Sequence, residues 1–288
     1  MIRGKRWMGV FARGMAMGVA EVVPGVSGGT IAFVTGIYEE LVTSLAQFRP
    51  ASLGEALRDP RGFWRTHNLG FLLCLVAGML TAVLLFARAL VHALEMTPTV
   101  VWGFFFGLIA ASVVMIGRAR SVRLLGSIGV LGVVLGFLST RIVPGNLDAT
   151  LAIYFIGGAL AVCAWILPAV SGSFLLLVIG IYQPVLTAVS HFDFLVIGVF
   201  VLGCLVGLMS FSRLLNYLMM RVREPLLALL TGFMAGAAVR LWPWQFQETL
   251  YAPDAWAAAT GEPARAVATL MAMVAGIFGI WMLSRLEH

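Results

Sequence analysis

Residues 20–38 read AEVVPGVSGGTIAFVTGIY, and this stretch interrupts an otherwise strongly apolar part of the chain. It places Pro24, a serine and a glycine pair in the middle of the segment, and it carries an acid, Glu21, just before them. Proline removes a backbone donor and glycine permits a tight turn, so a helix that enters this stretch should break there. The position of this break, beside an acid in an apolar segment, is the feature from which we predict the fold.

The composition of the chain indicates an integral membrane protein. Of its 288 residues, 61% are hydrophobic and only 11% are charged, and the mean hydropathy is +0.99. Soluble domains have about 45–50% apolar and about 25% charged residues. The apolar runs are about 20 residues long and lack a period of two, which favours transmembrane helices over a β-barrel. We therefore expect an all-α polytopic membrane protein.

Six apolar runs are long enough to cross a bilayer as single helices. The expected spans are residues 69–93, 99–117, 122–140, 194–219, 225–241 and 264–283. Two further regions, about 8–46 and 150–190, are each broken in the middle and are expected to form a helical hairpin. The basic N-terminus lacks the cleavage site of a signal peptide, and residues 286–288 resemble the remnant of a purification tag.

The two broken regions are copies of each other. The sequence EVVPGVSGGTIAFVTGIYEELV, which begins at Glu21, aligns without a gap with WILPAVSGSFLLLVIGIYQPVL, which begins at Trp165, at a constant offset of 144 residues. We expect two repeats, residues 1–143 and 144–285, each containing one hairpin and three spans. Because three is an odd number, the second repeat should enter from the opposite side of the membrane, which makes the repeats inverted.

A weaker sign of duplication is a proline followed by GxxxG in each half of the chain. Pro98 precedes Gly103 and Gly107, and Pro225 precedes Gly232 and Gly236. A GxxxG pattern in an apolar helix is typical of close helix packing. We expect no more from it than that.

The distribution of basic residues supports the inverted arrangement. If each hairpin returns to its starting side, 15 of the 19 basic residues fall in the cytoplasm, as the positive-inside rule requires, together with both termini. The cytoplasmic set is Arg3, Lys5, Arg6, Arg13, Arg49, Arg58, Arg61, Arg65, Arg118, Arg120, Arg123, Arg213, Arg221, Arg223 and Arg285. The outer set is Arg88, Arg141, Arg240 and Arg265. Two full spans in place of a hairpin give the same count, but the break favours a re-entrant hairpin.

The breaks predict a site for an anion. A new helix should begin after each break, with Ser27 and Ser171 as N-caps. In inverted repeats the two helix N-termini would face each other near the midplane, where free N–H groups and positive dipole ends bind anions, as in transporters with paired broken helices. The expected substrate-binding residues are Ser27, Gly28, Gly29, Thr30, Ser171, Gly172 and Ser173. The alternative is a simple kink in an ordinary helix.

Two arginines and one acid are further candidates for a role in transport. Arg88 and Arg213 should each lie about 10 Å from the midpoint of its helix, toward opposite sides of the membrane. Guanidinium binds phosphate in a fork, so these residues are candidates for passing a headgroup across. The alternative is that they snorkel to the interface. Glu21 is either a coupling residue for a proton or cation or a cap for the helix of its own repeat.

Aromatic and basic residues near the hairpins have interfacial interpretations. Tyr38 and its counterpart Tyr182 are expected to be interfacial anchors, with a site role as the alternative. Residues 47–66 combine arginines with aromatic and leucine side chains. That pattern is typical of a stretch that lies on the anionic inner leaflet.

Other classes of function fit the sequence less well. Residues 25–29, GVSGG, match the G-x-S-x-G motif of a serine hydrolase, but the strand–turn–helix context is missing, and the second copy loses the pattern. We expect no enzyme, metal, cofactor or nucleic-acid partner. There is no GxxxxGK[ST] motif, so a gradient is the expected driving force. A transporter or channel for a small anion stays open as an alternative.

The motif pair also carries a family resemblance. PGVSGGT…GIYEELV and LPAVSGSF…GIYQPVL resemble the undecaprenyl (polyprenyl) phosphate translocase family, long known only as a domain of unknown function, and the similarity covers about residues 8–283. It implies a multi-pass protein of the bacterial cytoplasmic (inner) membrane. Such a flippase would return undecaprenyl phosphate from the outer to the inner leaflet for reuse in peptidoglycan synthesis. It also implies an acid after the motif tyrosine, so Glu39 is a second candidate coupling residue, whereas Gln183 stands in the second copy.

Overall fold

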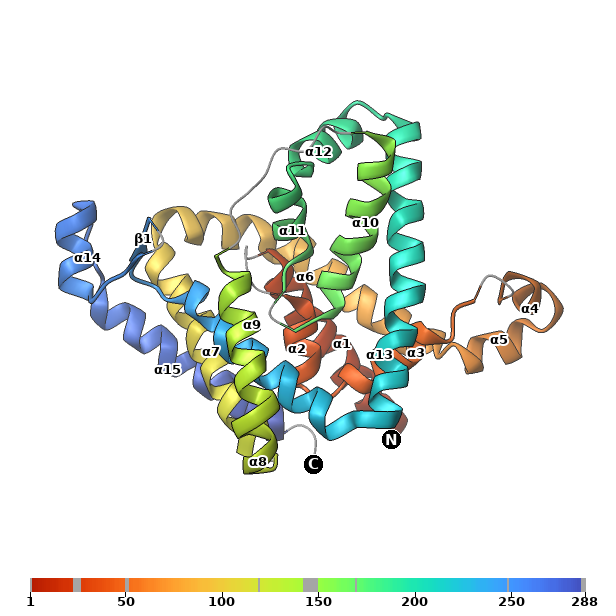
Figure 1. The fold of residues 1–288 in the computed structure, drawn as a ribbon, viewed down its shortest axis with the longest axis horizontal. Helices are drawn as coiled ribbons and strands as arrows, with labels where there is room; N and C mark the ends of the chain where they lie inside the picture. The colour runs from red at the N-terminus through yellow and green to blue at the C-terminus, as the bar shows by residue number, and fades with distance from the viewer. Residues whose placement is uncertain are drawn as a thin grey trace. The chain divides into compact units, whose positions relative to one another are not determined.

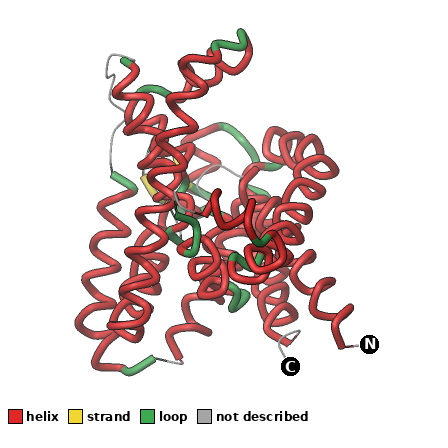
Figure 2. The backbone as a smooth tube through the Cα atoms, turned by 90° about the vertical axis from the view of Figure 1, so that its right-hand side faces the viewer, coloured by secondary structure: helices red, strands yellow, loops and turns green. Residues whose placement is uncertain are grey.

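The chain is almost entirely helical in a computed structural model, which describes residues 2–22, 27–49, 52–118, 120–141, 150–168, 170–247 and 249–285 (Figures 1 and 2). In those ranges the strands are confined to the antiparallel pair β1 (Gln245–Phe246) and β2 (Thr249–Leu250). Among the described residues, four helices are long and apolar enough to cross a membrane, or five if one bent pair is counted as a span. The prediction of a multi-pass all-α protein agrees with this architecture. Residues 286–288, the expected tag remnant, lie outside the described ranges.

The expected spans coincide closely with observed helices. They are α6 (Leu69–Met96), α7 (Pro98–Arg118), the run of α8 (Val122–Leu124), a π-helical turn (Leu125–Gly129) and α9 (Val130–Ser139), and α13 (Phe194–Ala237). Beyond a 3₁₀ turn (Ala238–Leu241), the chain ends with α14 (Pro253–Thr260) and α15 (Ala266–Arg285). The apolar part of α15 is shorter than the other spans.

One junction differs from the expectation of separate helices. The spans predicted at 194–219 and 225–241 are joined in α13 by a kink at Val222, where the backbone has φ −137° and ψ 46°, and no loop separates them. Pro225 follows three residues later. Proline lacks a backbone donor and crowds the preceding turn, so it accounts for a bend at this point.

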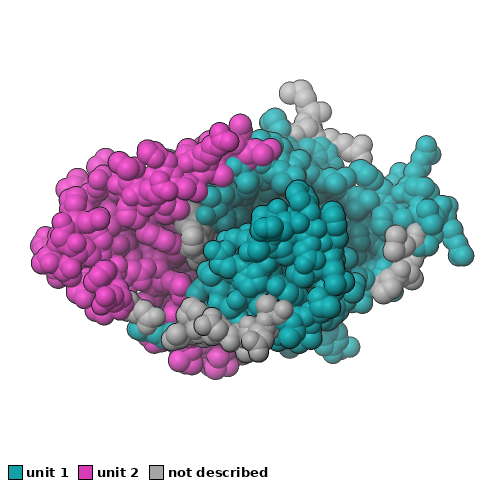
Figure 3. Space-filling view, turned by 90° about the horizontal axis from the view of Figure 1, so that it is seen from above, with its two compact units in different colours: residues 1–83, 141–226 teal, residues 84–140, 227–288 magenta. Residues whose placement is uncertain are grey.

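The described elements form two compact units, each made from both halves of the sequence (Figure 3). Unit 1 contains residues 1–83 and 141–226, and unit 2 contains residues 84–140 and 227–288. Helices α6 and α13 therefore contribute to both units. This spatial division does not follow the proposed repeats 1–143 and 144–285, which stay a prediction.

Unit 1 contains both broken regions, and they have the same order of elements. The first consists of α1 (Ile2–Val22), α2 (Gly28–Val34) and α3 (Tyr38–Ala46), and the second of α10 (Leu151–Ile166), α11 (Gly172–Ile179) and α12 (Tyr182–Ser190). The starts of α2 and α11, and of α3 and α12, are 144 residues apart, as the alignment predicted. The axes of α11 and α12 differ by 104°.

Glycines let equivalent helices of unit 1 approach at the backbone. A Cβ at Gly14 of α1 would collide with the carbonyl of Leu75 in α6, and a Cβ at Gly158 of α10 would collide with the carbonyl of Phe200 in α13. Gly14 and Gly158 are again 144 residues apart. The first helix of each broken region thus packs in the same way on the long helix that follows it.

Unit 2 uses its GxxxG glycines in the same manner. Gly103 and Gly107 of α7 face the backbone of α15 at Thr269 and Met273, so these two helices run parallel. Gly232 and Gly236 of α13 face the backbone at Gly129, the end of the π-helical turn, and at Val133 of α9, which makes a second parallel pair. Small residues permit this close approach, so the predicted role of both GxxxG motifs is confirmed.

The helices α4 (Ser52–Arg58) and α5 (Pro60–Thr66) project from unit 1 and lie within the basic segment 47–66 (Figure 1). The side chain of His67, the residue after α5, bridges the two helices through hydrogen bonds and is 1% exposed. Its Nε2 lies 3.1 Å from the Ser52 hydroxyl, and its Nδ1 lies 3.0 Å from the Phe63 carbonyl oxygen. Leu57 is 86% exposed, so the pair presents an apolar side chain among arginines.

Candidate functional site

Both broken regions restart as helices with a serine cap. The Ser27 Oγ accepts a hydrogen bond from the Gly29 N–H at 3.1 Å, and the Ser171 Oγ accepts one from the Phe174 N–H at 3.4 Å. Both serines have the extended backbone of an N-cap and both are buried. These bonds satisfy donors that the first turn of a helix leaves free. The predicted helix starts and caps are confirmed.

The first motif lies directly against the end of α10. The Ser27 hydroxyl is 3.3 Å from the carbonyl oxygen of Trp165 and 3.4 Å from that of Leu167. A Cβ at Gly29 would lie 2.8 Å from the carbonyl oxygen of Ile166, so only glycine fits here without a shift. The start of α2 therefore meets the end of α10, and opposite dipole ends attract. That the starts of α2 and α11 face each other stays a prediction.

Glu21 occupies the start of α2. Its Oε1 accepts a hydrogen bond from the Gly28 N–H at 2.6 Å. A carboxylate at a helix N-terminus is stabilised both by the charge-assisted bond and by the dipole. Glu21 therefore caps the helix of its own repeat, which is the alternative that the sequence left open. A coupling role for Glu21 stays a prediction.

The start of α11 has no such acid. Trp165 stands at the position equivalent to Glu21, and the Ser171 and Ser173 hydroxyl oxygens lie 2.9 Å apart. Ser173 is exposed, whereas Gly29, its counterpart in α2, is buried. Of the two predicted anion sites, the one at α11 therefore presents hydroxyls and an N-terminus that no described carboxylate of its own repeat caps in the same way.

The acids that follow the first motif are tied to other helices. Glu39 Oε1 lies 2.6 Å from Nη2 of Arg223 in α13, and Glu40 Oε1 lies 2.7 Å from Nη2 of Arg6 in α1. Both pairs are partly exposed to solvent. Glu39 was a predicted coupling residue, but its partner was not foreseen, nor was any role for Glu40. The sequence signal for this helix start was the pair of adjacent acids, because acidic side chains are favoured in the first turn of a helix.

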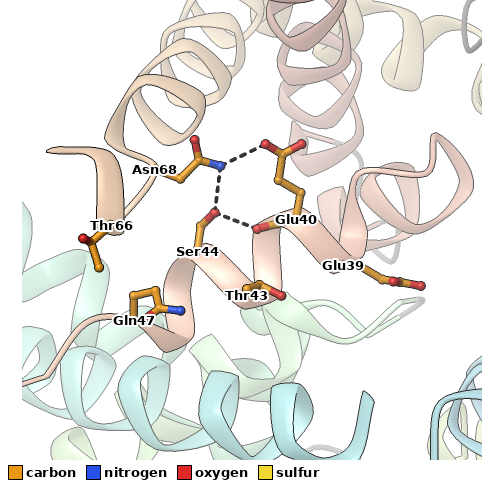
Figure 4. A pocket seen from close by; sticks show the side chains of 7 residues that line it. All are labelled: Glu39, Glu40, Thr43, Ser44, Gln47, Thr66 and Asn68. Atoms are coloured by element: carbon orange, nitrogen blue, oxygen red, sulfur yellow. Dashed lines mark hydrogen bonds between the residues drawn. The ribbon is translucent and has the colours of Figure 1, made fainter. Parts of the chain in front are cut away.

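A polar cleft of about 290 Å³ opens beside these acids. In Figure 4, the Asn68 amide nitrogen reaches Glu40 Oε1 at 2.9 Å and the Ser44 hydroxyl at 3.2 Å. Its lining is Glu39, Glu40, Thr43, Ser44, Gln47, Thr66 and Asn68. The hydrogen bonds fix α3 to the start of α6, so the cleft is braced by side chains from both helices.

The two predicted arginines have different surroundings. Arg213 donates from Nη2 to the carbonyl oxygen of Phe48, just beyond the end of α3, while its Nε is buried without a partner in the described ranges. Arg88 is exposed on α6, and no hydrogen bond or ion pair joins it to another described residue. Arg88 belongs to unit 2 and Arg213 to unit 1. A relay between them stays a prediction.

Tyr38 does not fit the role of an interfacial anchor. It is 2% exposed, its ring stands edge-on to Phe33 at 5.3 Å, and its hydroxyl has no hydrogen-bond partner among the described residues. Its counterpart Tyr182 is partly exposed and packs on the apolar cluster around Ile181. Within the described part of the chain, no three His, Cys, Asp or Glu side chains are placed to hold a metal ion.

Comparison with known proteins agrees with the motif resemblance. The chain is 41% identical over 249 residues to a polyprenyl-phosphate transporter of Vibrio cholerae, covering 85% of this chain and 80% of that protein. It is 30% identical over 258 residues to a polyprenyl-phosphate transporter of Staphylococcus aureus, covering 83% and 87%. No solved structure matches. Residues 17–257 match the family described as undecaprenyl phosphate translocase-like, and the chain belongs to that family.

Proposed function

We propose that this protein carries polyprenyl phosphate across the bacterial cytoplasmic membrane, from the outer to the inner leaflet, so that the lipid is reused in cell-wall synthesis. The two relatives named as polyprenyl-phosphate transporters support the substrate class. The observation that carries the proposal is the serine-capped start of α11, where Ser171 and Ser173 stand without an acid at the Glu21 position.

The phosphate binds, in this proposal, at the start of α11. The Ser171 and Ser173 hydroxyls exchange the hydrogen bond between them for hydrogen bonds that they donate to the phosphate. The first N–H groups of the helix, including that of Gly172, add the positive end of its dipole. The counterpart residues Ser27 to Thr30 of α2 form the buried wall of the site. The Ser27 hydroxyl already bonds to the end of α10, and the Gly28 N–H already bonds to Glu21. In this proposal these residues therefore shape the site and do not bind the phosphate directly.

The proposed architecture is a pair of inverted repeats with re-entrant hairpins. Its support is the offset of 144 residues, which relates the starts of α2 and α11 and also the glycines at helix crossings, Gly14 and Gly158. In unit 2, the second span of each repeat pairs in parallel with the third span of the other. A two-fold relation between the repeats generates such an exchange naturally.

Arg88 and Arg213 complete the proposed route at its two ends. Arg88 has a free, exposed guanidinium in the described part of the chain and receives the headgroup on the outer side. Arg213 must leave the Phe48 carbonyl to take the phosphate on the inner side. Glu39, paired with Arg223 at the partly exposed start of α3, and Glu21, which also caps α2, are the proposed coupling residues for a proton or cation.

The test is transport by the purified protein in liposomes. Labelled undecaprenyl phosphate is placed in one leaflet, and its sidedness is followed over time. We expect the wild-type chain to equilibrate the label, and the Ser171→Ala/Ser173→Ala double variant to lose most of that activity. Ser190→Ala, an exposed serine bonded within its own helix, is the matched control and should transport normally.

A small-anion transporter is the competing function, because the same site suits any phosphate. Parallel liposomes loaded with labelled inorganic phosphate distinguish the two. Release of inorganic phosphate without movement of the lipid overturns the proposed substrate. Equal activity of the double variant and the wild type overturns the proposed site.

A further inference from the structure

A groove of about 500 Å³ lies between α7 and α15 of unit 2. Its volume is within the range of about 300–1,000 Å³ that small-molecule sites occupy. Its lining is apolar except for a single cation, Arg118, the last residue of α7. The groove belongs to neither serine-capped motif, and the proposed transport site does not use it.

The sequence of the two helices explains why a groove forms there. Gly103 and Gly107 hold α7 close to α15. In the following turns, the small side chains of Ala110 and Ala111 leave space that longer residues would fill. Ile280 is 2% exposed and forms the floor, whereas Val114 is 52% exposed and stands at the rim. The groove is thus open at its side, as a site that admits a chain from the bilayer must be.

Arg118 stands at one end of this apolar surface. Ala110, Val114 and Arg118 are spaced by four residues and therefore lie along one face of α7. The Arg118 side chain is exposed, and no other described residue forms a hydrogen bond or ion pair with it. A cation at a helix C-terminus is common because it complements the dipole. Its position at the end of an apolar groove, however, also matches a ligand with one apolar chain and an anionic head.

We propose that this groove binds the part of the prenyl chain next to the phosphate of polyprenyl phosphate, with the phosphate on Arg118. This inference rests on the proposed function, but it adds a second site for the same lipid. A phosphate monoester carries more negative charge than the diester of a phospholipid and has three oxygens for a guanidinium fork. One groove accommodates one chain, whereas a phospholipid has two.

The site belongs to the cytoplasmic end of the route. Arg118 is a member of the basic set that the positive-inside rule assigns to the cytoplasm. Because α7 and α15 run parallel, both helices end on the side where Arg118 lies. The groove therefore holds the lipid in the leaflet to which transport delivers it.

The experiment uses the full-length protein in liposomes with a polyprenyl phosphate that carries a photoreactive group on its chain. After illumination, the labelled peptides are mapped. We expect labels on the groove segments of α7 and α15, and competition by unlabelled polyprenyl phosphate. Arg118→Gln should reduce labelling about tenfold, the loss that follows from removing one charged hydrogen-bond partner. Ala111→Trp, which fills the groove, should reduce it at least as much.

Two matched variants lie outside the groove. Arg123→Gln removes an exposed arginine of α8, and Ala275→Trp adds the same bulk to an exposed position of α15. Both should label as the wild type does. If Ala111→Trp does not fold, Arg118→Gln alone decides the question, because its side chain is exposed and its loss leaves the packing intact.

The outcomes separate this proposal from the proposed function. If the wild type transports the lipid but the labels lie outside the groove, or a two-chain phospholipid competes equally well, the groove proposal is wrong and the function stands. If the groove is labelled with the expected variant pattern but no lipid crosses the membrane, the transport function is wrong and the binding site stands.

Discussion

The two broken hairpins share a sequence motif, but different interactions hold them in place. In the first, polar side chains tie the hairpin down: Glu21 caps α2, Glu39 pairs with Arg223, and Glu40 pairs with Arg6. In the second, the equivalent positions carry Trp165, Gln183 and Pro184. There the hairpin packs through an apolar cluster made of Tyr154, Ala161, Leu176 and Ile181.

The helices that restart after the two breaks, α2 and α11, also differ in how deeply they are buried. Every residue of α2 is buried, whereas Leu176 is the buried residue of α11. The start of α2 is therefore enclosed in unit 1, whereas at the start of α11 Ser171 is buried and Ser173 is exposed. The two regions share one motif, but the described side chains around them differ, which is why we propose the second copy as the ligand site.

The largest expected effect comes from filling the contact between the hairpins. Gly29→Val would place carbon atoms against the carbonyls of Trp165 and Ile166, where even a Cβ would lie at 2.8 Å. We expect a loss of up to about 3 kcal/mol in the free energy of unfolding, as is typical of overpacking. Thermal unfolding in detergent measures it. Gly198→Val is the control, because nothing lies within 4 Å of a Cβ there. Equal stability of both variants would refute the contact.

The next effect is expected from removing the acid that distinguishes the hairpins. Glu21→Ala removes a carboxylate that accepts the Gly28 N–H, and hydrogen bonds to charged groups contribute about 1.5–3 kcal/mol. Glu21→Gln keeps an acceptor and should lose less. Unfolding measurements rank the variants. If Glu21→Gln is as stable as the wild type but transport loses its dependence on pH, the acid couples transport and the capping interpretation is insufficient.

The serine caps should separate stability from binding. Each Ser→Ala change removes a cap that contributes about 0.5–2 kcal/mol. Ser27→Ala should destabilise the protein more, since Ser27 also reaches the carbonyls of Trp165 and Leu167. Ser171→Ala should weaken lipid phosphate binding more. Unfolding measurements and binding titrations on both variants test this. If Ser27→Ala and Ser171→Ala lose stability and lipid binding to the same extent, the two serines do not have different roles.

The smallest effect is expected at the ion pair of the first hairpin. Glu39 and Arg223 are 46% and 52% exposed, and exposed pairs of this kind contribute about 0.2–1 kcal/mol. A double-mutant cycle with Glu39→Gln and Arg223→Gln measures the coupling. Glu39→Gln alone reproduces the residue that the second copy carries at this position, Gln183. A coupling energy near zero would show that the pair does not hold α3 to α13.

The local features of this protein could be predicted from its sequence. The apolar composition predicted a multi-pass helical membrane protein, the alignment of EVVPGVSGG with WILPAVSGS predicted where both regions break, and Ser27 and Ser171 predicted where helices restart. The GxxxG motifs predicted close helix crossings. These features follow from residues within a few positions of one another, because proline, glycine and capping side chains act on the backbone next to them.

The partners of these local features could be found only in the three-dimensional fold. It placed Glu21 as a cap on α2, joined Glu39 to Arg223 across 184 residues, and set the start of α2 against the end of α10. It also divided the chain into units that mix both halves. Such contacts depend on how whole helices pack. The partner of a carboxylate or hydroxyl is therefore set by the helices packed around it, and not by the residues next to it in the chain.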